Sequence, residues 1–268
     1  MLSRRQAIVF AVGSMFLTVL VLNAREVLPG TINCSEGQLT VDGQAVAANN
    51  SGTAVLNPGQ TLQTGQGRAE LLLTPGVYVR LGENSALKMD SLSASQVKVE
   101  LMRGEAVVEV DQVDKNRRLD LIDKGADAHL DRSGVYLFNA SDPAIAVYNG
   151  KVRVEDDRRG IELGRGQELR LNDAALKPQK FDRAGTDAVY AWSEKRAGYA
   201  SQVSEWTGEA LLGLDGRPQY AEGWYWSPWF NSWAFIPMKG HVLTPFGYGL
   251  YAPHVPHFSP PVFGDFRN

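Results

Sequence analysis

Few residues of this chain have the types and spacing that catalysis or metal binding requires. His129 lies in an alternating segment beside Asp127 and Asp131, and His254 and His257 stand three positions apart in a proline-rich stretch. Two imidazoles without a nearby cysteine or acid are too few ligands for zinc. The sequence also lacks a Gly-x-Ser-x-Gly motif and a phosphate-binding glycine loop followed by lysine. We therefore expect no catalytic residue, no cofactor and no metal, and we keep a hydrolase only as the third alternative.

Five aspartates between positions 111 and 127 are interleaved with basic residues. They are Asp111, Asp114, Asp120, Asp123 and Asp127. None belongs to a continuous D-x-D-x-D-G loop of the kind that binds calcium. We interpret them as a solvated charged edge, which discourages pairing with foreign strands.

Aromatic side chains are concentrated near the end of the chain, where Gly223–Phe235 holds four of the six tryptophans. Each tryptophan presents roughly 150–250 Å² of surface, so four exposed ones would exceed the patch that a soluble monomer usually leaves open. Most should therefore be covered by the chain's own β domain, by another protein, by glycan or by lipid. The candidate contacts with a partner or glycan are Trp224, Tyr225, Trp226, Trp229 and Trp233.

The first 24 residues predict export. Arg4 and Arg5 precede an uncharged apolar run over residues 7–22, and Ala24 offers a small residue for cleavage. As a helix the run is about 24 Å long, which is short for a bilayer core of about 30 Å. We expect either a signal peptide cleaved near Ala24 or a short transmembrane anchor formed by residues 7–22. In both cases the rest of the chain faces the periplasm of a bacterial-type cell envelope.

Charge and cysteine content narrow the range of partners. Without residues 1–24, acids outnumber basic residues by about five, which disfavours nucleic acid and an anionic membrane surface. Cys34 is the single cysteine, so an internal disulfide cannot form. We expect partners among envelope proteins or a second copy of the chain, and membrane contact only through the N-terminal segment.

Residues 30–172 alternate apolar and polar side chains in short runs punctuated by glycine, which is the pattern of strands and tight turns. Three pairs of runs predict hairpins, with turns at Arg103-Gly104, Asn149-Gly150 and Arg165-Gly166. Asn-Gly is the strongest of these turn signals, because both residues tolerate the positive φ of a two-residue turn. The units look like successive turns of one β architecture.

The stretch from Pro58 to Met89 resembles the core of a FecR-type domain. The family's pattern runs G-x-x-L-x-T-G, then G-x-A-x-L-x-L, then G-x-x-V-x-L-x-x-x-S. The matching residues here are Gly59, Leu62, Thr64, Gly65, Gly67, Ala69, Leu71, Leu73, Gly76, Val79, Leu81 and Ser85. The later strands resemble the family's closing strands, so the match covers about residues 54–172.

The resemblance implies a mainly β module of short antiparallel strands, solenoid-like or roll-like, that serves signalling or protein contact in the cell envelope rather than catalysis. Well-known members couple this module to a cytoplasmic anti-sigma segment and a membrane helix. Only six residues precede the apolar run of this chain. We therefore expect no anti-sigma segment, and the role of sigma-factor regulator is less favoured.

After the β domain the pattern changes, and the segment 182–208 predicts one helix, from about 187 to 207. Arg196 falls on its apolar face, where its stem could cover an aromatic ring while its charge reaches water or an acid. Thr186 or Asp187 would cap the start, and Gly208 would follow the end. We expect the helix to pack on the β domain. Apolar and aromatic residues at steps of three, four and seven positions form one stripe along this helix. They are Val189, Trp192, Tyr199, Val203 and Trp206.

Residues 214–268 form an arm that is rich in proline, tryptophan and tyrosine. Proline at this density excludes long helices and central strands, whereas disordered chains are poor in aromatic residues. We expect extended structure with local hairpins from about 222 to 238 and an irregular end from about 252. Trp224 and Trp226 alternate with Tyr225, so one side of the hairpin can pack inward.

One functional hypothesis accounts for most of these features. We expect a non-enzymatic cell-envelope protein whose FecR-type β module serves as a protein-interaction scaffold or a signalling module. The helix and the aromatic arm would secure this module to itself or to a partner. The alternative is a glycan- or cell-wall-binding protein that uses the aromatic arm.

Overall fold

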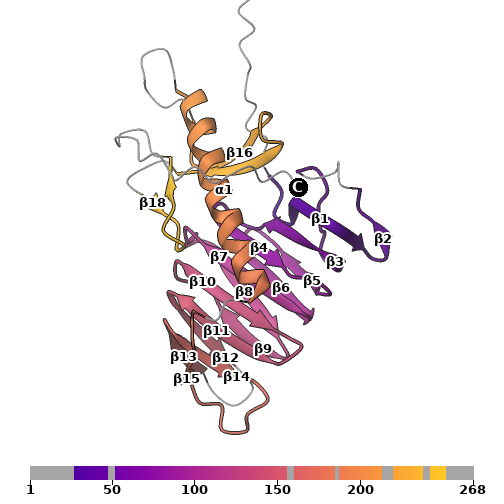
Figure 1. Cartoon of the computed structure of the whole chain (residues 1–268), viewed down its shortest axis with the longest axis vertical. Coiled ribbons are helices and arrows are strands. Elements are labelled where there is room, and N and C mark those ends of the chain that lie inside the picture. Colours follow the sequence, from indigo (N-terminus) through magenta and orange to yellow (C-terminus); the bar gives the residue numbers. More distant parts are fainter. Residues whose placement is uncertain are drawn as a thin grey trace, which may run out of the picture.

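The computed structural model describes residues 27–47, 52–155, 160–184, 187–212, 220–237 and 242–251. The predicted export segment, the irregular end from about 252 and the pair His254 and His257 lie outside these residues. The described chain is mainly β with one helix, as predicted (Figure 1). No helix within it is long and apolar enough to cross a membrane.

Fifteen strands form one continuous sheet. The bounds of the first eight are β1 Thr31–Val41, β2 Gln44–Ala45, β3 Thr61–Leu72, β4 Val77–Leu81, β5 Ala86–Leu92, β6 Gln96–Arg103, β7 Glu105–Val110 and β8 Arg118–Asp123. The bounds of the other seven are β9 Ala126–His129, β10 Gly134–Asn139, β11 Ala144–Asn149, β12 Lys151–Glu155, β13 Gly160–Gly164, β14 Gln167–Arg170 and β15 Gln179–Lys180. All strand pairs are antiparallel except the parallel pair β6–β8.

The long strand β3 makes this sheet fold over into two layers. Residues 61–63 of β3 pair with β5, whereas residues 69–72 pair with β4. The first layer therefore continues through β5, β6, β8, β9, β12 and β13, and the second through β4, β7, β10, β11, β14 and β15. Strand β1, which contains the half-buried Cys34, runs along β3 across the fold. The result is an open β roll.

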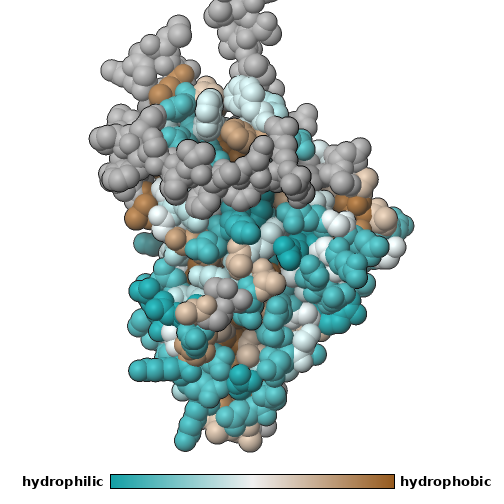
Figure 2. Space-filling model, viewed as in Figure 1, coloured by the Kyte–Doolittle hydropathy of each residue, from teal (hydrophilic) through white to brown (hydrophobic). Residues whose placement is uncertain are grey.

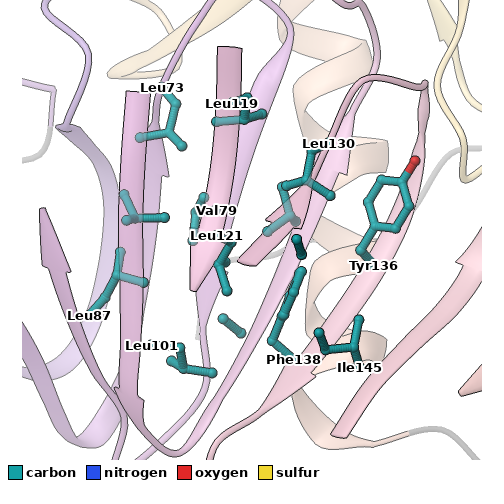
Figure 3. Packing of buried hydrophobic residues seen from close by; sticks show 14 of the residues in the cluster. Leu73, Val79, Leu87, Leu101, Leu119, Leu121, Leu130, Tyr136, Phe138 and Ile145 are labelled. Atoms are coloured by element: carbon teal, nitrogen blue, oxygen red, sulfur yellow. The ribbon is translucent and has the colours of Figure 1, made fainter. Parts of the chain in front are cut away.

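The core lies between the two layers (Figure 3). Leu87, Leu101 and Leu121 come from the first layer and meet Val79 and Phe138 from the second. Each is at most 1% exposed, and burial of a side chain of this size contributes roughly 1.5–3 kcal/mol. The leucines and valines of the FecR-like motif are part of this core. Their alternation along the strands thus builds the inner face of both layers.

The three predicted hairpins are wrong, because their strands do not pair with each other. Strand β6 pairs with β5 and β8, whereas β7 pairs with β4 and β10. The turns at Arg103-Gly104, Asn149-Gly150 and Arg165-Gly166 instead carry the chain from one layer to the other. Alternation predicts which side chains of a strand form its apolar face. It does not show whether two strands pair within one sheet or face each other across the core.

Two features brace these crossings. Gly104 has a φ of 78° and lies against Ser85, so the chain reverses there with little room for a side chain. The Ser85 backbone N–H donates to Thr64 Oγ1 at 2.9 Å, and Thr64 Oγ1 donates to the Gly82 carbonyl at 2.6 Å. Thr64 and Ser85 of the FecR-like motif therefore hold a further crossing, between β4 and β5, as buried polar residues outside the apolar core.

The helix and the aromatic arm cover the outer face of the second layer. Helix α1 spans Ala188–Ala210, and the arm forms the hairpin of β16 Gly223–Ser227 and β17 Ser232–Ile236. The hairpin predicted from about 222 to 238 is thereby confirmed. A second small hairpin joins β18 Val242–Leu243 to β19 Gly249–Leu250. We call these elements together the cap.

The start of α1 agrees with the prediction, whereas its C-terminal end differs. Asp187 occupies the N-cap position but makes no side-chain capping hydrogen bond. Gly208 lies inside the helix, which continues to Ala210. A side chain at Gly208 would collide with the ring of Tyr251, so this glycine permits a close contact and does not end the helix.

Candidate interaction surfaces

The aromatic hairpin is inserted between the second layer and α1, so both of its sides are covered. On one side, Trp224, Trp233 and Phe235 pack on Tyr78, with the Tyr78 and Trp224 rings 5.0 Å apart, edge to face. On the other side, Tyr225 packs with Val203 of α1. The sequence predicted that one side of the hairpin packs inward. In the structure, α1 covers the other side as well.

The candidate contact residues differ in their accessibility. Trp224, Tyr225 and Trp233 are 5–6% exposed. Trp233 Nε1 donates to the Gly52 carbonyl at 2.8 Å. Trp226 is partly buried, and only Trp229 is largely exposed, at 58%. Contact with a partner or glycan stays a prediction, and in this structure its accessible part consists of Trp229 and part of Trp226.

A buried ionic network attaches the cap to the sheet. Arg80 of β4 donates from Nε to Glu70 Oε2 at 2.7 Å and from Nη1 to Glu109 Oε2 at 2.6 Å. Arg196 of α1 donates from Nη2 to Glu70 Oε1 at 2.7 Å, and its guanidinium lies 4.8 Å from the centre of the Tyr199 ring. Arg196 thus covers an aromatic ring and reaches an acid, as predicted. Glu70, Arg80 and Glu109 are fully buried.

The pKa values in this network follow from the available partners. Burial alone would raise the pKa of Glu70, but Arg196 and Arg80 outweigh it and hold the pKa at about 2. Burial raises the pKa of Glu109 despite Arg80. Burial and the neighbouring Glu109 raise the pKa of Asp111 well above its usual range. The network is therefore centred on the ionised Glu70.

Sequence reasoning missed this network, although a signal was present. Glu70, Arg80 and Glu109 each stand in the middle of an apolar strand, in the stretches AELLL, VYVRL and VVEV. A charged residue in such a place is rarely buried unless it is paired. Three such residues in one small domain are therefore expected to pair with one another.

The outer face of the first layer carries a different set of charges, which is partly exposed and surrounds the buried carboxylate of Asp120. Asp120 of β8 and His129 of β9 are paired across the strands, with Asp120 Oδ1 2.5 Å from His129 Nδ1. His129 Nε2 lies 2.9 Å from Glu155 Oε2 of β12, and Lys98 Nζ lies 2.7 Å from Asp127 Oδ2. We call this surface the open face. Beside it is a hollow of about 570 Å³ lined in part by Arg117, Arg118, His129, Asp131 and Arg132.

The pKa values on the open face favour the charged forms. Burial would raise the pKa of Asp120, but hydrogen bonds from His129, Gln96 and Arg118 lower it. Burial would lower the pKa of His129, but hydrogen bonds to Asp120 and Glu155 raise it. His129 therefore lies between two carboxylates as part of an ion-pair ladder across three strands.

Asp120, Asp127 and His129 are the one group of the described residues whose ligand atoms could hold a metal ion, within 4.8 Å of one another. Two cations already occupy the neighbourhood. Lys98 Nζ and Arg118 Nε each lie 2.7 Å from a carboxylate of this group. A metal ion would have to displace these cations, so the donor set fits an ion-pair ladder better than a metal centre.

The predicted solvated edge of five aspartates is wrong for three of them. Asp111, Asp120 and Asp123 are at most 7% exposed. Asp123 lies on the same side of β8 as Leu119 and Leu121, which faces the core. Its carboxylate has no hydrogen-bond partner in the described structure, and burial raises its pKa to about 7.

The end of the cap carries two exposed tryptophans beside a partly buried phenylalanine. Trp206 is 62% exposed, so its predicted place on the inward stripe of α1 is wrong, whereas Val189, Trp192 and Val203 on that stripe are buried. The Trp206 ring lies 6.5 Å from that of Phe230 in the hairpin turn. We call Trp206, Trp229 and Phe230 the aromatic tip.

The fold defines a two-layered β roll with one outer face covered by its own cap and the other open. Residues 60–153 match the FecR protein family. The chain therefore contains a FecR-type domain, as the motif predicted, and the sheet extends beyond the matched residues on both sides. No curated protein sequence matches the chain.

Two solved structures resemble part of the chain. Both are crystal structures of a proposed anti-sigma factor from Parabacteroides distasonis ATCC 8503, at 2.50 and 1.65 Å resolution. Each aligns with a TM-score of 0.41 and 17% identity over 52% of this chain. The chain spans 64–65% of the length of those proteins.

Proposed function

We propose that this chain is a non-enzymatic cell-envelope protein whose FecR-type β module binds another protein through the open face. One observation carries the proposal. The chain covers the outer face of the second layer with its own helix and hairpin, whereas the ion-pair ladder of the first layer remains at the surface. Arg153 and Glu155 on this ladder are 63% and 44% exposed. A ladder of alternating charges can select a partner and orient it.

Two further observations support this function. The match to the FecR protein family fits a signalling or regulatory module. His129 is engaged with Asp120 and Glu155, so its imidazole is not paired with a nucleophile in the way that covalent catalysis requires. The glycan alternative has less support, because three of its five aromatic residues are buried.

A photo-crosslinking experiment in envelope preparations tests the proposal. A crosslinking amino acid at position 153 of the full chain should capture a defined partner. The same amino acid at position 170 should not, because Arg170, which is 44% exposed, lies in the second layer. Arg153→Glu should reduce the capture at least tenfold and Arg170→Glu should leave it unchanged. Equal capture from both positions would refute the open face as the binding surface.

A further inference from the structure

Exposed large apolar residues are concentrated on the cap and in the segment before β1 that packs against it. The described residues contain five such side chains: Leu28, Met102, Trp206, Trp229 and Leu243. Only Met102, in β6, belongs to the body of the roll. Leu28 follows Val27 and Leu243 follows Val242, and both valines pack on the cluster formed by Trp224, Trp233 and Phe235. The large exposed apolar side chains thus lie mainly on the cap and beside it.

The arrangement of the elements agrees with this distribution. The C-terminal end of α1 and the hairpin of β16 lie at one end of the long axis, and β11 to β15 lie at the other (Figure 1). Figure 2 shows hydrophilic side chains over most of the lower half of the roll in the same view. The molecule therefore has an aromatic end and a hydrophilic end.

The described chain begins beside the cap, five residues after the apolar run of residues 7–22. Val27, the first described residue, packs on the cap together with Trp226. Five peptide units separate Leu22 from Val27, and they span at most about 18 Å. An anchor formed by residues 7–22 would therefore hold the cap close to the bilayer surface.

Tryptophan is suited to that position, since its ring is apolar and its N–H can bond to water or headgroups. We propose that the aromatic tip, Trp206 with Trp229 and Phe230, inserts into the headgroup region of the membrane in which the chain is anchored. The proposal rests on the anchor, one of the two alternatives for residues 7–22, and it adds a second membrane contact to that segment.

The charges near the tip specify the kind of lipid surface. Glu205 and Glu209 lie within one turn of Trp206 on α1. Acidic side chains repel anionic headgroups, so the contact depends on the aromatic rings and not on anionic lipid. In this orientation the hydrophilic end of the roll projects away from the membrane and the open face stays accessible to a partner.

Fluorescence quenching of the full chain in phosphatidylcholine vesicles tests the proposal. Lipids brominated near the headgroup should quench about a third of the emission, because two of the six tryptophans lie at the tip. The double variant Trp206→Phe, Trp229→Phe keeps apolar rings and should lose most of this quenching. Met102→Ala, at an exposed position on the roll, should keep it, and a fraction of anionic lipid should not increase it.

Two measurements distinguish the membrane contact of the aromatic tip from that of the anchor. Release of the full chain by alkaline carbonate would refute the anchoring on which the proposal rests. Retention in the membrane combined with equal quenching of the double variant and the unmodified chain would refute the tip contact alone. Quenching by neither brominated lipid nor aqueous acrylamide would also overturn the proposal, because the tip would then be covered by protein.

Discussion

The two outer faces of the roll use the same kinds of charged residues in opposite surroundings. Under the cap, the Arg80 and Glu70 side chains are 0% exposed and 2.7 Å apart. On the open face, Arg153 and Glu155 lie 2.8 Å apart but are 63% and 44% exposed. The two distances are nearly equal, but separating the buried pair costs much more free energy than separating the exposed pair. Water can replace the lost partner only on the open face.

Two buried carboxylates extend the comparison. Glu70 has two arginines and Asn33 as partners, and its pKa is held at about 2. Asp123, at the end of β8, has no hydrogen-bond partner within the described part of the chain, and burial raises its pKa to about 7. Burial alone does not set the charge of a carboxyl group; the partners decide it.

Removal of Arg80 should have the largest effect. Arg80→Met leaves Glu109 without its cation and Glu70 with only one, so we expect a loss of about 3–5 kcal/mol in the free energy of unfolding. Urea denaturation followed by circular dichroism measures it. The matched control is Arg153→Met on the open face, with an expected loss below about 1 kcal/mol. Similar losses in the two variants would contradict the difference between the faces.

Asp123→Asn should instead stabilise the protein at high pH. The folded pKa of about 7 lies above the ordinary 3.8, so this carboxyl's contribution to stability is fully present below pH 3.8 and is lost as the pH rises through 7. An amide avoids the buried charge, and we expect a gain of about 2–3 kcal/mol at pH 8 that vanishes near pH 4. Asp127→Asn, which removes an ion pair with Lys98, should show no such gain. A gain independent of pH would disprove the explanation.

Arg196→Met should loosen the cap with a smaller loss, about 1–2 kcal/mol, because Glu70 keeps Arg80 and Asn33. Hydrogen exchange should accelerate in α1 and β17. The lowered pKa of Glu70 contributes stability above its ordinary value of 4.5, which is lost as the pH falls to about 2. Acid unfolding of the variant should therefore begin at a higher pH. The exposed neighbour Lys195→Met serves as control, and equal exchange in both variants would argue against the attachment.

His129→Gln on the open face should have the smallest effect, about 1 kcal/mol, because Asp120 keeps its hydrogen bonds from Gln96 and Arg118. The pKa of His129 is raised above its ordinary 6.5 by Asp120 and Glu155. Its contribution to stability is therefore present below pH 6.5 and is lost as the pH rises through the folded value. Unfolding measured at pH 5.5 and pH 8.5 should show a larger loss at the lower pH. Lys151→Gln, an exposed control on the same layer, should lose equally at both.

Several parts of the fold could be predicted because they depend on local pattern. The alternation in residues 30–172 predicted the strands, the helical stripe predicted α1, and the FecR-like motif predicted the module. The hairpin of β16 and β17 followed from a short aromatic segment interrupted by Pro228. All of these depend on neighbours within a few positions along the chain.

The errors arose where distant segments meet. Gly104 and Gly150 looked like hairpin turns, since nothing local distinguishes a turn within a sheet from a crossing between two layers. Trp206 follows the stripe of α1 but lies beyond the surface that the hairpin covers. The buried Asp111 and Asp123 looked solvated because they lie close to lysine and arginine in sequence.

The sequence alone determined that this is a mainly β protein with a FecR-type motif, one helix and an aromatic hairpin, because backbone periodicity and turn chemistry act over short distances. Only the tertiary structure decided which face the cap covers, which tryptophans remain exposed and which charges are buried. Those properties depend on contacts such as Arg196 with Glu70, 126 positions apart. Such contacts form only when the layers and the cap have been packed together.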